Sequence, residues 1–311
     1  MNVVSLPRVP DEADEFIRLH TKDYGAVPDE ERIRLQRKDV EDSIVLAPEA
    51  NDRLIVHNGH QVGVRIIRPT RRARGVALDV HGGGWFTGRA AMNDQSNAAL
   101  AHALGIAVVS VDYRLAPEWP FPAAVEDCTA AARWLLANAT IEFGTDRTVM
   151  IGESAGAQPA LLALLALRDE PEPSGSFRGA AFSYGMFDLG HTPSQRGAGA
   201  GPDVLSPQGI EFFTRLYVGA MGDENRRHER VSPLYADLTG LPPALLMAGT
   251  ADHLVDDSAF LAARWQRGDP GTQLVLYQDA PHGADHLPSI GPDWVARRND
   301  FLASRLALAT H

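Results

Sequence analysis

Residues 148–165 read TVMIGESAGAQPALLALL, so a Gly-x-Ser-x-Gly motif separates two apolar runs. The first run predicts a strand over residues 148–152, and the second belongs to a helix that we predict over residues 155–168. A serine on so tight a strand-to-helix turn needs small neighbours, because side chains two positions away on either side would collide. The pattern predicts that Ser154 is a nucleophile at the carboxyl end of a strand. Glu153 is expected to point away from it and to be structural.

Around this motif, the composition predicts one catalytic unit with an accessory piece. The chain has 311 residues, of which 44% are hydrophobic, and it carries a formal net charge of −11. The negative charge disfavours a nucleic-acid or anionic-membrane partner, since both require a basic surface. The amino terminus lacks the apolar stretch of a signal peptide, and residues 160–167 are far short of the roughly 20 residues that span a bilayer. We therefore expect a cytoplasmic protein without a membrane partner.

Apolar runs and helical patterns alternate from about residue 52 onward, which is typical of a mostly parallel sheet with helices on both faces. The eight predicted strands span residues 53–56, 63–68, 76–80, 107–112, 148–152, 179–183, 244–249 and 273–277. The predicted helices span residues 94–104, 123–138, 155–168, 255–267 and 293–307. A polar turn at residues 57–61 indicates that the first two strands form an antiparallel hairpin. The predicted fold class is α/β.

Two segments interrupt this alternation. Residues 11–39 suggest two short amphipathic helices, and residues 191–231 combine a Gly/Pro-rich stretch with a helical pattern over residues 207–218. Together they predict a helical cap, with residues 1–45 as its N-terminal part and an insertion at about 191–231 in a catalytic domain of residues 46–311. The alternative is two peripheral helical decorations. Residues 195–203, rich in Gly and Ala, are expected to be poorly ordered.

A glycine-rich loop follows the strand at residues 76–80 and reads HGGGW over residues 81–85. Consecutive glycines let the backbone approach a substrate closely, so that N–H groups face its oxygen. We predict that the N–H groups of Gly83, Gly84 and Ala155 form an oxyanion hole. A plain flexible loop is the alternative interpretation.

A nucleophilic serine also needs a base and an acid that orients the base. The chain order expected for this arrangement, serine then acid then histidine, restricts the base to late histidines. His282 is the best placed, after the strand at residues 273–277, and His286 is its rival. Asp252 follows the strand at residues 244–249 and is the predicted acid. Asp256 and Asp257 have the positions of first-turn helix residues, which the helix dipole favours.

Metal and cysteine chemistry are not predicted. His282 and His286 have a His-x-x-x-His spacing, but Gly283 follows the first and no carboxylate motif of a zinc site accompanies them. Cys128 is the chain's one cysteine, so it cannot form an internal disulfide, and we expect it to be a buried small hydrophobe. No cofactor is predicted.

Four motifs together resemble the hormone-sensitive-lipase family of α/β-hydrolases, mainly its bacterial esterases. They are HGGGW at 81–85, DYRLAPE at 112–118, FPAAVEDC at 121–128 and GESAG at 152–156. The resemblance extends from about residue 76 to the last helix. It implies an α/β-hydrolase fold with a partly N-terminal cap, a triad of Ser154, Asp252 and His282, and hydrolysis of short-to-medium acyl esters. It also implies that Asp112 and Arg114 support the oxyanion loop. Relatives usually have proline where this chain has His253 and Gly185.

The predicted function is therefore that of a serine carboxylesterase acting on a small-molecule acyl ester. An amidase or deacetylase uses the same triad, and a non-catalytic receptor on the same fold belongs to a different class. Retention of both Ser154 and His282 argues against the receptor. Candidate pocket walls are Trp85, Phe86, Phe212, Phe213 and Leu216, although aromatic residues are more often core residues. A homodimer through the last edge strand is compatible with this fold.

Overall fold

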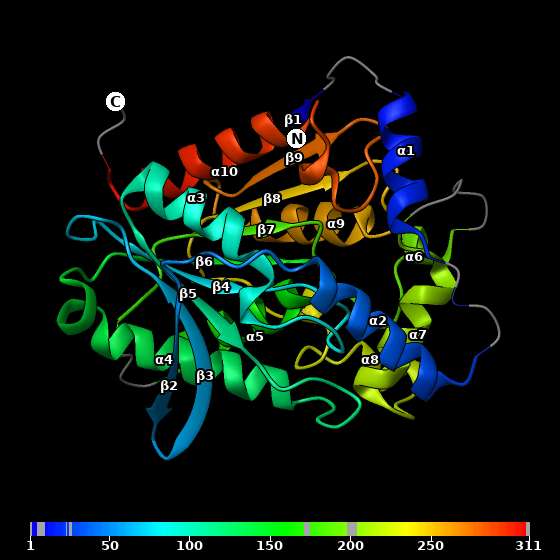
Figure 1. The fold of residues 1–311 in the computed structure, drawn as a ribbon, viewed down its shortest axis with the longest axis horizontal. Coiled ribbons are helices and arrows are strands. Elements are labelled where there is room, and N and C mark those ends of the chain that lie inside the picture. The colour runs from blue at the N-terminus through cyan, green and yellow to red at the C-terminus, as the bar shows by residue number, and fades with distance from the viewer. Residues whose placement is uncertain are drawn as a thin grey trace.

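One continuous sheet forms the centre of the molecule (Figure 1). The computed structural model describes residues 2–4, 10–22, 24, 27–170, 175–197 and 204–308. The nine strands of the sheet are ordered β1-β9-β8-β7-β6-β4-β5-β3-β2. In chain order, they are β1 (Asn2–Val4), β2 (Asn51–His57), β3 (His60–Ile67), β4 (Val76–Val80), β5 (Ala107–Asp112), β6 (Thr148–Glu153), β7 (Ala180–Ser183), β8 (Ala244–Gly249) and β9 (Gln273–Tyr277).

The strand directions follow from the connections. β2 and β3 pair antiparallel across a two-residue turn, Asn58-Gly59, with both residues at positive φ, and β3 is antiparallel to β5. The remaining pairs are parallel. The predicted α/β class, the eight strands and the hairpin are therefore confirmed. β1 was not predicted, because three residues carry too little periodicity to show a strand.

Helices cover both faces of the sheet. The hydrophobic cluster that includes Leu78 of β4 takes side chains from α4 (Ala123–Phe143), α5 (Ala157–Arg168) and α9 (Val255–Trp265). The cluster that includes the adjacent Ala77 takes them from α3 (Asp94–Leu104) and α10 (Gly291–Arg305). Successive side chains of a strand point to opposite faces, so both faces of a parallel sheet are apolar and need covering. Side chains that are to reach a ligand must then lie at a sheet edge or beyond the strand ends.

A further group of helices lies beyond the carboxyl ends of the strands (Figure 1). It consists of α1 (Pro10–His20), α2 (Asp29–Ser43), α6 (Pro193–Arg196), α7 (Pro207–Val218) and α8 (Asp223–Arg226). α2 contacts α7 through an Arg215–Asp29 ion pair at 2.7 Å and through the Arg32 guanidinium, 3.9 Å from the centre of the Phe212 ring. Of the Gly/Ala-rich stretch at 195–203, residues 198–203 lie outside the described residues. Among the described helices, none combines the length and apolarity that crossing a bilayer requires.

Candidate active site

Ser154 lies on a strained turn between β6 and α5. Its φ is +48°, and a 3-10 turn over Ser154–Gly156 leads into the helix. A Cβ on Gly156 would lie 2.1 Å from the carbonyl oxygen of His81, and one on Gly152 would lie 3.1 Å from the Cα of Ala157. The distance at Gly156 is too short for any side chain, and that at Gly152 would require the neighbouring backbone to shift, so glycine suits both positions. Ser154 itself is only partly buried.

Three side chains that are far apart in the sequence meet at this turn. The Oγ of Ser154 lies 3.0 Å from the Nε2 of His282, and the Nδ1 of His282 lies 2.9 Å from the Oδ2 of Asp252. The other oxygen of Asp252 accepts a hydrogen bond from the N–H of Leu254 at 2.8 Å. The Asp252 carboxylate is fully buried and the His282 side chain is 12% exposed. The structure therefore brings together the three residues that the sequence singled out.

The rival histidine lies elsewhere. His286 is exposed, and its ring stacks on that of Phe16 in α1, with 6.5 Å between ring centres. Phe16 also lies 3.4 Å from the position of a Cβ on Gly283, directly beside His282. The ring of Tyr184 meets the His282 ring nearly edge-on, with 4.7 Å between centres. The imidazole of His282 is thus held between Asp252 and Tyr184, with α1 beside its loop.

The glycine loop lies against the serine turn. A Cβ on Gly82 would lie 3.2 Å from the Cβ of Ser154. Gly83 has a φ of +101° and Gly84 a φ of +60°, a region that favours glycine. The Gly83 carbonyl accepts hydrogen bonds from the N–H groups of Phe86 and Thr87. Within the described part of the chain, the N–H groups of Gly83, Gly84 and Ala155 reach no acceptor, whereas that of Gly82 points to Glu153 Oε1 at 3.4 Å.

The loop is supported from behind by residues that the sequence did not single out. His81 is buried, its Nδ1 donates to the Gly82 carbonyl at 2.8 Å, and its ring stacks on Tyr113. Burial lowers the pKa of His81 to about 4, so this histidine is neutral at pH 7. The hydroxyl of Tyr113 donates to the His81 carbonyl at 2.9 Å. Tyr113 thus contacts the loop directly, as does Ala116 of the same DYRLAPE motif, whose N–H donates to the Trp85 carbonyl at 2.9 Å.

The resemblance implied that Asp112 and Arg114 support this loop. Their hydrogen bonds and ion pairs join segments next to it. Asp112 Oδ1 accepts a hydrogen bond from the N–H of Ala90, six residues beyond Gly84. Arg114 pairs with Asp127 at the start of α4, at 2.9 Å. Both residues thus bind segments next to the loop, which is compatible with the indirect supporting role that the resemblance implies.

The aromatic candidates form a cluster between the glycine loop and α7. The ring of Trp85 stacks on Tyr217 with 4.4 Å between centres, and its edge faces Phe213. Phe86 meets Phe212 edge to face. Trp85 is fully buried, so its surface is occupied by packing. Phe213 lies directly beside the loop, since a Cβ on Gly84 would lie 3.1 Å from its Cβ. Leu216 is partly buried against the same cluster.

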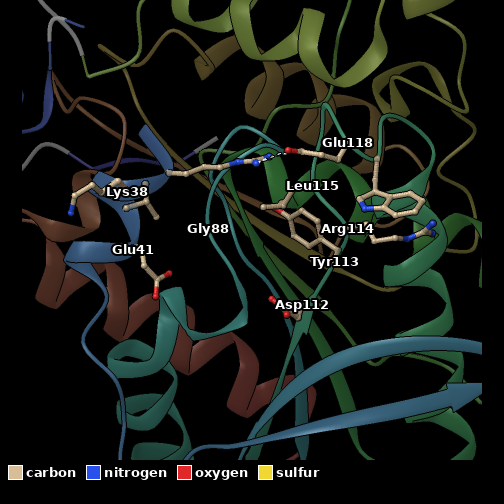
Figure 2. Close-up of a pocket in the computed structure, with 11 residues that line it drawn as sticks. Lys38, Glu41, Gly88, Asp112, Tyr113, Arg114, Leu115 and Glu118 are labelled. Atoms are coloured by element: carbon tan, nitrogen blue, oxygen red, sulfur yellow. Dashed lines mark hydrogen bonds and ion pairs between the residues drawn. The ribbon is translucent and has the colours of Figure 1, made fainter. Parts of the chain in front are cut away.

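A separate cavity of about 670 Å³ lies between α2 and residues 112–119 (Figure 2). Its lining mixes both charges, including Lys38, Glu41, Asp112 and Glu118, and contains no residue of the Ser154 constellation. Arg37 of α2 crosses its rim: its Nε donates to the Phe86 carbonyl and its Nη2 to the Ala116 carbonyl, each at 2.8 Å, and it pairs with Glu118. α2 is thereby joined to the segment that follows the glycine loop.

The described residues contain no cluster of three or more His, Cys, Asp or Glu side chains arranged to hold a metal ion. A hydroxyl in contact with an imidazole, an imidazole in contact with a buried carboxylate, and free backbone donors beside the hydroxyl are the parts needed for nucleophilic attack on a carbonyl carbon.

Comparisons with known proteins show which family the chain resembles. Residues 77–286 match a family model described as the alpha/beta hydrolase fold. The chain is 36% identical over 273 residues to the carboxylesterase NlhH of Mycobacterium tuberculosis, covering 84% of this chain and 83% of that protein. It is 35% identical over 208 residues to an acetyl-hydrolase of Streptomyces hygroscopicus, covering 66% and 67%.

Solved structures are similar over nearly the whole chain. A hyperthermophilic esterase from Pyrobaculum calidifontis superimposes with a TM-score of 0.83 at 26% identity, covering 98% of this chain and all of that one. An esterase described as belonging to the bacterial hormone-sensitive lipase family superimposes with a TM-score of 0.79 at 31% identity, covering 96% of this chain and 100% of that one.

Proposed function

The chain belongs to the hormone-sensitive-lipase family of α/β-hydrolases and hydrolyses esters, and we propose that it does so through an acyl-enzyme formed on Ser154. The observation that carries the proposal is the unbroken chain of contacts from the Ser154 hydroxyl through His282 to Asp252, at 3.0 and 2.9 Å. Those distances are within the range in which a base takes a proton from a nucleophile.

In the proposed reaction, the Ser154 Oγ attacks the acyl carbon while His282 Nε2 takes the hydroxyl proton. Asp252 keeps the proton-bearing Nδ1 of His282 toward itself and stabilises the imidazolium that forms. His282 then donates the proton to the departing alcohol. Water attacks the acyl group in turn, and His282 removes its proton and returns it to Ser154 as the acid leaves.

The negative charge of the tetrahedral intermediate needs donors that are already in place. The N–H groups of Gly83, Gly84 and Ala155 are the proposed donors, since all three lack an acceptor among the described residues and the glycine loop touches the serine turn. Loss of one such donor typically costs about 10²- to 10³-fold in turnover. The positive φ of both glycines explains why the loop can present N–H groups and no side chains.

For the substrate, we propose a small-molecule ester with a short-to-medium acyl chain, beneath a cap formed by α1, α2, α6, α7 and α8. Two contacts support the proposed cap: Phe16 of α1 lies beside Gly283, and Phe213 of α7 lies beside Gly84. A profile of hydrolysis from acetyl to dodecanoyl esters, with a matched amide, measures the acyl range and separates an esterase from an amidase.

The nucleophile is tested by Ser154→Ala. Turnover of a short p-nitrophenyl ester should fall by at least about 10⁴-fold, because attack and proton transfer both pass through the missing hydroxyl. Ser289→Ala, an exposed serine whose hydroxyl makes no contact with the site, is the matched control and should retain full activity. Circular dichroism checks that both variants fold. Unchanged turnover in folded Ser154→Ala would refute the assignment.

A further inference from the structure

One segment of the chain contacts the Ser154 turn, the His282 ring and the loop of Asp252. None of its own residues belongs to the proposed triad. Residues 184–197, here called the brace, leave the carboxyl end of β7, pass the serine turn and end in α6. The brace includes the first part of the predicted cap insertion. The role that we infer for it is to position the reaction at Ser154, and this role therefore rests on the proposed function.

The start of the brace is fitted closely to the serine turn. The N–H of Met186 donates to the carbonyl of Ser154 at 3.1 Å, and the Tyr184 ring lies against His282. Gly185 leaves no room for a side chain, because a Cβ there would lie 2.6 Å from the Cβ of Ala157. A shift of these residues would therefore move either the Ser154 backbone or the His282 ring.

A single buried carboxylate holds the brace in this position. Asp257, in the first turn of α9, has no exposed surface. Its Oδ1 accepts hydrogen bonds from the N–H groups of Phe187 at 2.6 Å and Asp188 at 2.8 Å. Its Oδ2 accepts from Gln195 Nε2 at 2.6 Å and Thr192 Oγ1 at 3.0 Å. Four donors on one carboxylate form a strong network in a buried site.

A second set of contacts joins the end of the brace to the loop that carries Asp252. Ser194 Oγ donates to the His253 carbonyl at 2.8 Å, and His253 Nδ1 donates to the Ser194 carbonyl at 3.0 Å. The Ser194 N–H donates to Asp256 Oδ2 at 2.8 Å. His253 follows the proposed acid directly, so the loop of Asp252 supplies a hydrogen-bond donor to the brace.

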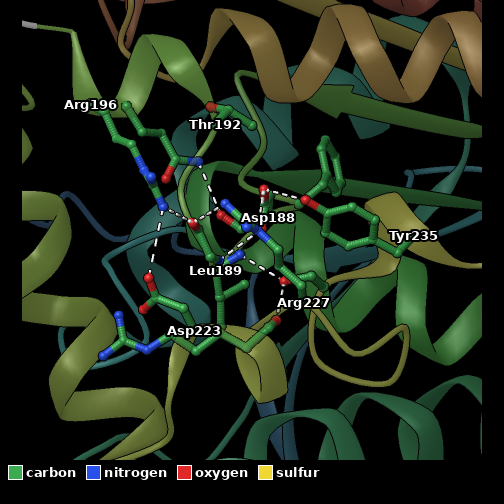
Figure 3. Close-up of polar contacts among 12 residues, drawn as sticks. Asp188, Leu189, Thr192, Arg196, Asp223, Arg227 and Tyr235 are labelled. Carbon is green, nitrogen blue, oxygen red and sulfur yellow. Dashed lines mark hydrogen bonds and ion pairs between the residues drawn. The ribbon is translucent and has the colours of Figure 1, made fainter.

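The outer side of the brace is anchored by residues that follow α7 and by Arg196 of its own α6 (Figure 3). The Tyr235 hydroxyl donates to Asp188 Oδ2 at 2.8 Å, and the guanidinium groups of Arg196 and Arg227 both donate to the Gly190 carbonyl. Figure 3 shows Tyr235 and Arg227 converging on Asp188. These contacts hold the brace, but none of them connects it to the triad.

We propose that Asp257 is a positioning residue for the triad. By holding residues 187–195 against the first turn of α9, it fixes the positions of the Ser154 turn, the His282 ring and the Asp252 loop relative to one another. The argument is one of connectivity. The N–H groups that Asp257 binds directly follow Met186, and its helix directly follows the loop of Asp252. One carboxylate therefore links the segment that contacts the nucleophile to the segment that carries the acid.

The test is Asp257→Ala and Asp257→Asn, with kcat and KM measured on a short p-nitrophenyl ester. Active sites are counted by fluorophosphonate labelling, so that kcat refers to folded, competent molecules. We expect Asp257→Ala to lower kcat by about 10- to 100-fold with KM within about threefold, because small displacements of catalytic groups act on the chemical step. Asp257→Asn keeps one acceptor and nearly the same volume but loses the acceptor that binds Thr192 and Gln195, so its kcat should lie between those of Asp257→Ala and wild type.

Tyr235→Phe is the matched control, because it removes a hydrogen bond that holds the brace without connecting it to the triad. It should lower the melting temperature and leave kcat per active site unchanged. The inference is overturned if Asp257→Ala has wild-type kcat per labelled site, or if Tyr235→Phe lowers kcat as much. If Asp257→Ala does not fold, wild-type kcat in Asp257→Asn is the overturning result. Turnover by Ser154→Ala would instead refute the proposed function itself.

Discussion

Glu153 is the residue next to the proposed nucleophile, and its carboxyl group faces two parts of the site. Its Oε1 accepts from the Gly82 N–H and its Oε2 from the Tyr184 hydroxyl, both at 3.4 Å. Burial, followed by the negative charges of Asp285 and Asp79, raises the pKa of Glu153 to about 7. Glu153 thus connects the glycine loop to Tyr184, the tyrosine that packs on His282, and this is the structural role that the structure supports for it.

This raised pKa predicts a pH dependence of stability. The folded protein holds the Glu153 proton more tightly than the unfolded chain, whose pKa is near 4.5. The contribution of Glu153 to the unfolding free energy is thus fully present below pH 4.5, declines as the pH rises toward 7, and is constant above that. Glu153→Gln cannot titrate. Its stability relative to wild type should rise between pH 4.5 and 7, measured by urea unfolding across a pH series.

Glu118→Gln is the control, because its stability relative to wild type should change with pH in the opposite direction. Its hydrogen bond to Arg37 holds the pKa of Glu118 below the ordinary value, so the native carboxylate stabilises the fold more as the pH rises. The stability of Glu118→Gln relative to wild type should accordingly fall as the pH rises from the acid range to just above 4.5, and stay constant at higher pH. A flat difference for Glu153→Gln across the series would show that Glu153 ionises equally in the folded and unfolded protein.

At the residue scale, the sequence indicated the members of the site that stand at strand ends. Ser154, Asp252 and His282 each follow an apolar run, and parallel strands bring such positions to one edge of the sheet. The sequence did not reveal the contacts of Tyr113, Tyr184 and Asp257, because these contacts are made with segments that are far away in the chain. Asp257 was predicted only as a first-turn helix residue, which the structure bears out while adding four hydrogen bonds.

At the scale of elements, α2 belongs to two parts of the molecule. It contacts α7 through Asp29 and Arg32, and it contacts the segment after the glycine loop through Arg37. Arg37 donates to two backbone carbonyls, those of Phe86 and Ala116, which no shorter side chain at this position would bridge. The position of α2 and that of the glycine loop are therefore coupled.

Arg37→Ala should weaken this coupling. Two partly buried carbonyl groups would lose their donor, and we expect the unfolding free energy to fall by about 1–3 kcal/mol. Turnover should fall several-fold, because Phe86 is two residues from Gly84. Arg34→Ala on the same helix is the control, since Arg34 pairs with Glu31 on the surface of α2. Unfolding and kcat are measured for both variants, and equal effects of the two would contradict a specific role for Arg37.

Element boundaries were predictable where the apolar pattern stops at a polar residue or glycine. β4, β5, β8, β9, α3 and α7 begin and end at the predicted residues. α4 was predicted to end at residue 138 but continues to Phe143, where Gly144 ends it with a φ of 77°. Residues 139–143 contain one charge and buried Ala139 and Phe143, so their helical pattern resembles that of the preceding turns.

At the scale of the whole molecule, β1 bears on self-association. Asn2–Val4 pairs in parallel with β9, in the register Asn2–Val275 to Val4–Tyr277. The last strand predicted from the sequence thus has a further strand on its outer side. A homodimer through β9 would require β1 to leave. The homodimer through the last edge strand remains a prediction.

Removal of residues 1–4 should therefore increase self-association, because it exposes the backbone N–H and C=O groups of β9. Light scattering over a range of protein concentrations measures the mass of the shortened and full-length proteins. The expected result is a larger, concentration-dependent mass for the shortened protein. Identical masses at all concentrations would show that β1 does not protect this edge.

The overall architecture was predictable from the alternation of apolar runs and helices, because each strand is a local pattern. The grouping of α1, α2 and α7 was predicted only as one of two alternatives. Their contacts join residues such as Asp29 and Arg215, which are 186 positions apart. Nothing in a local pattern distinguishes an ion pair of this kind from two solvated charges.

The two carbonyls bound by Arg37 set a condition for engineering chimeras. The helices of the proposed cap, here called the helical roof, and the site around Ser154 come from different segments of the chain. Exchanging the helical roof between homologous enzymes is therefore an attractive route to new selectivity. In this protein, α2 would belong to the exchanged part, but its Arg37 also binds the segment that follows the glycine loop. A donor roof without an equivalent side chain would alter the reacting centre as well as the specificity, so the transplant should include residues 37, 86 and 116–118 as one unit.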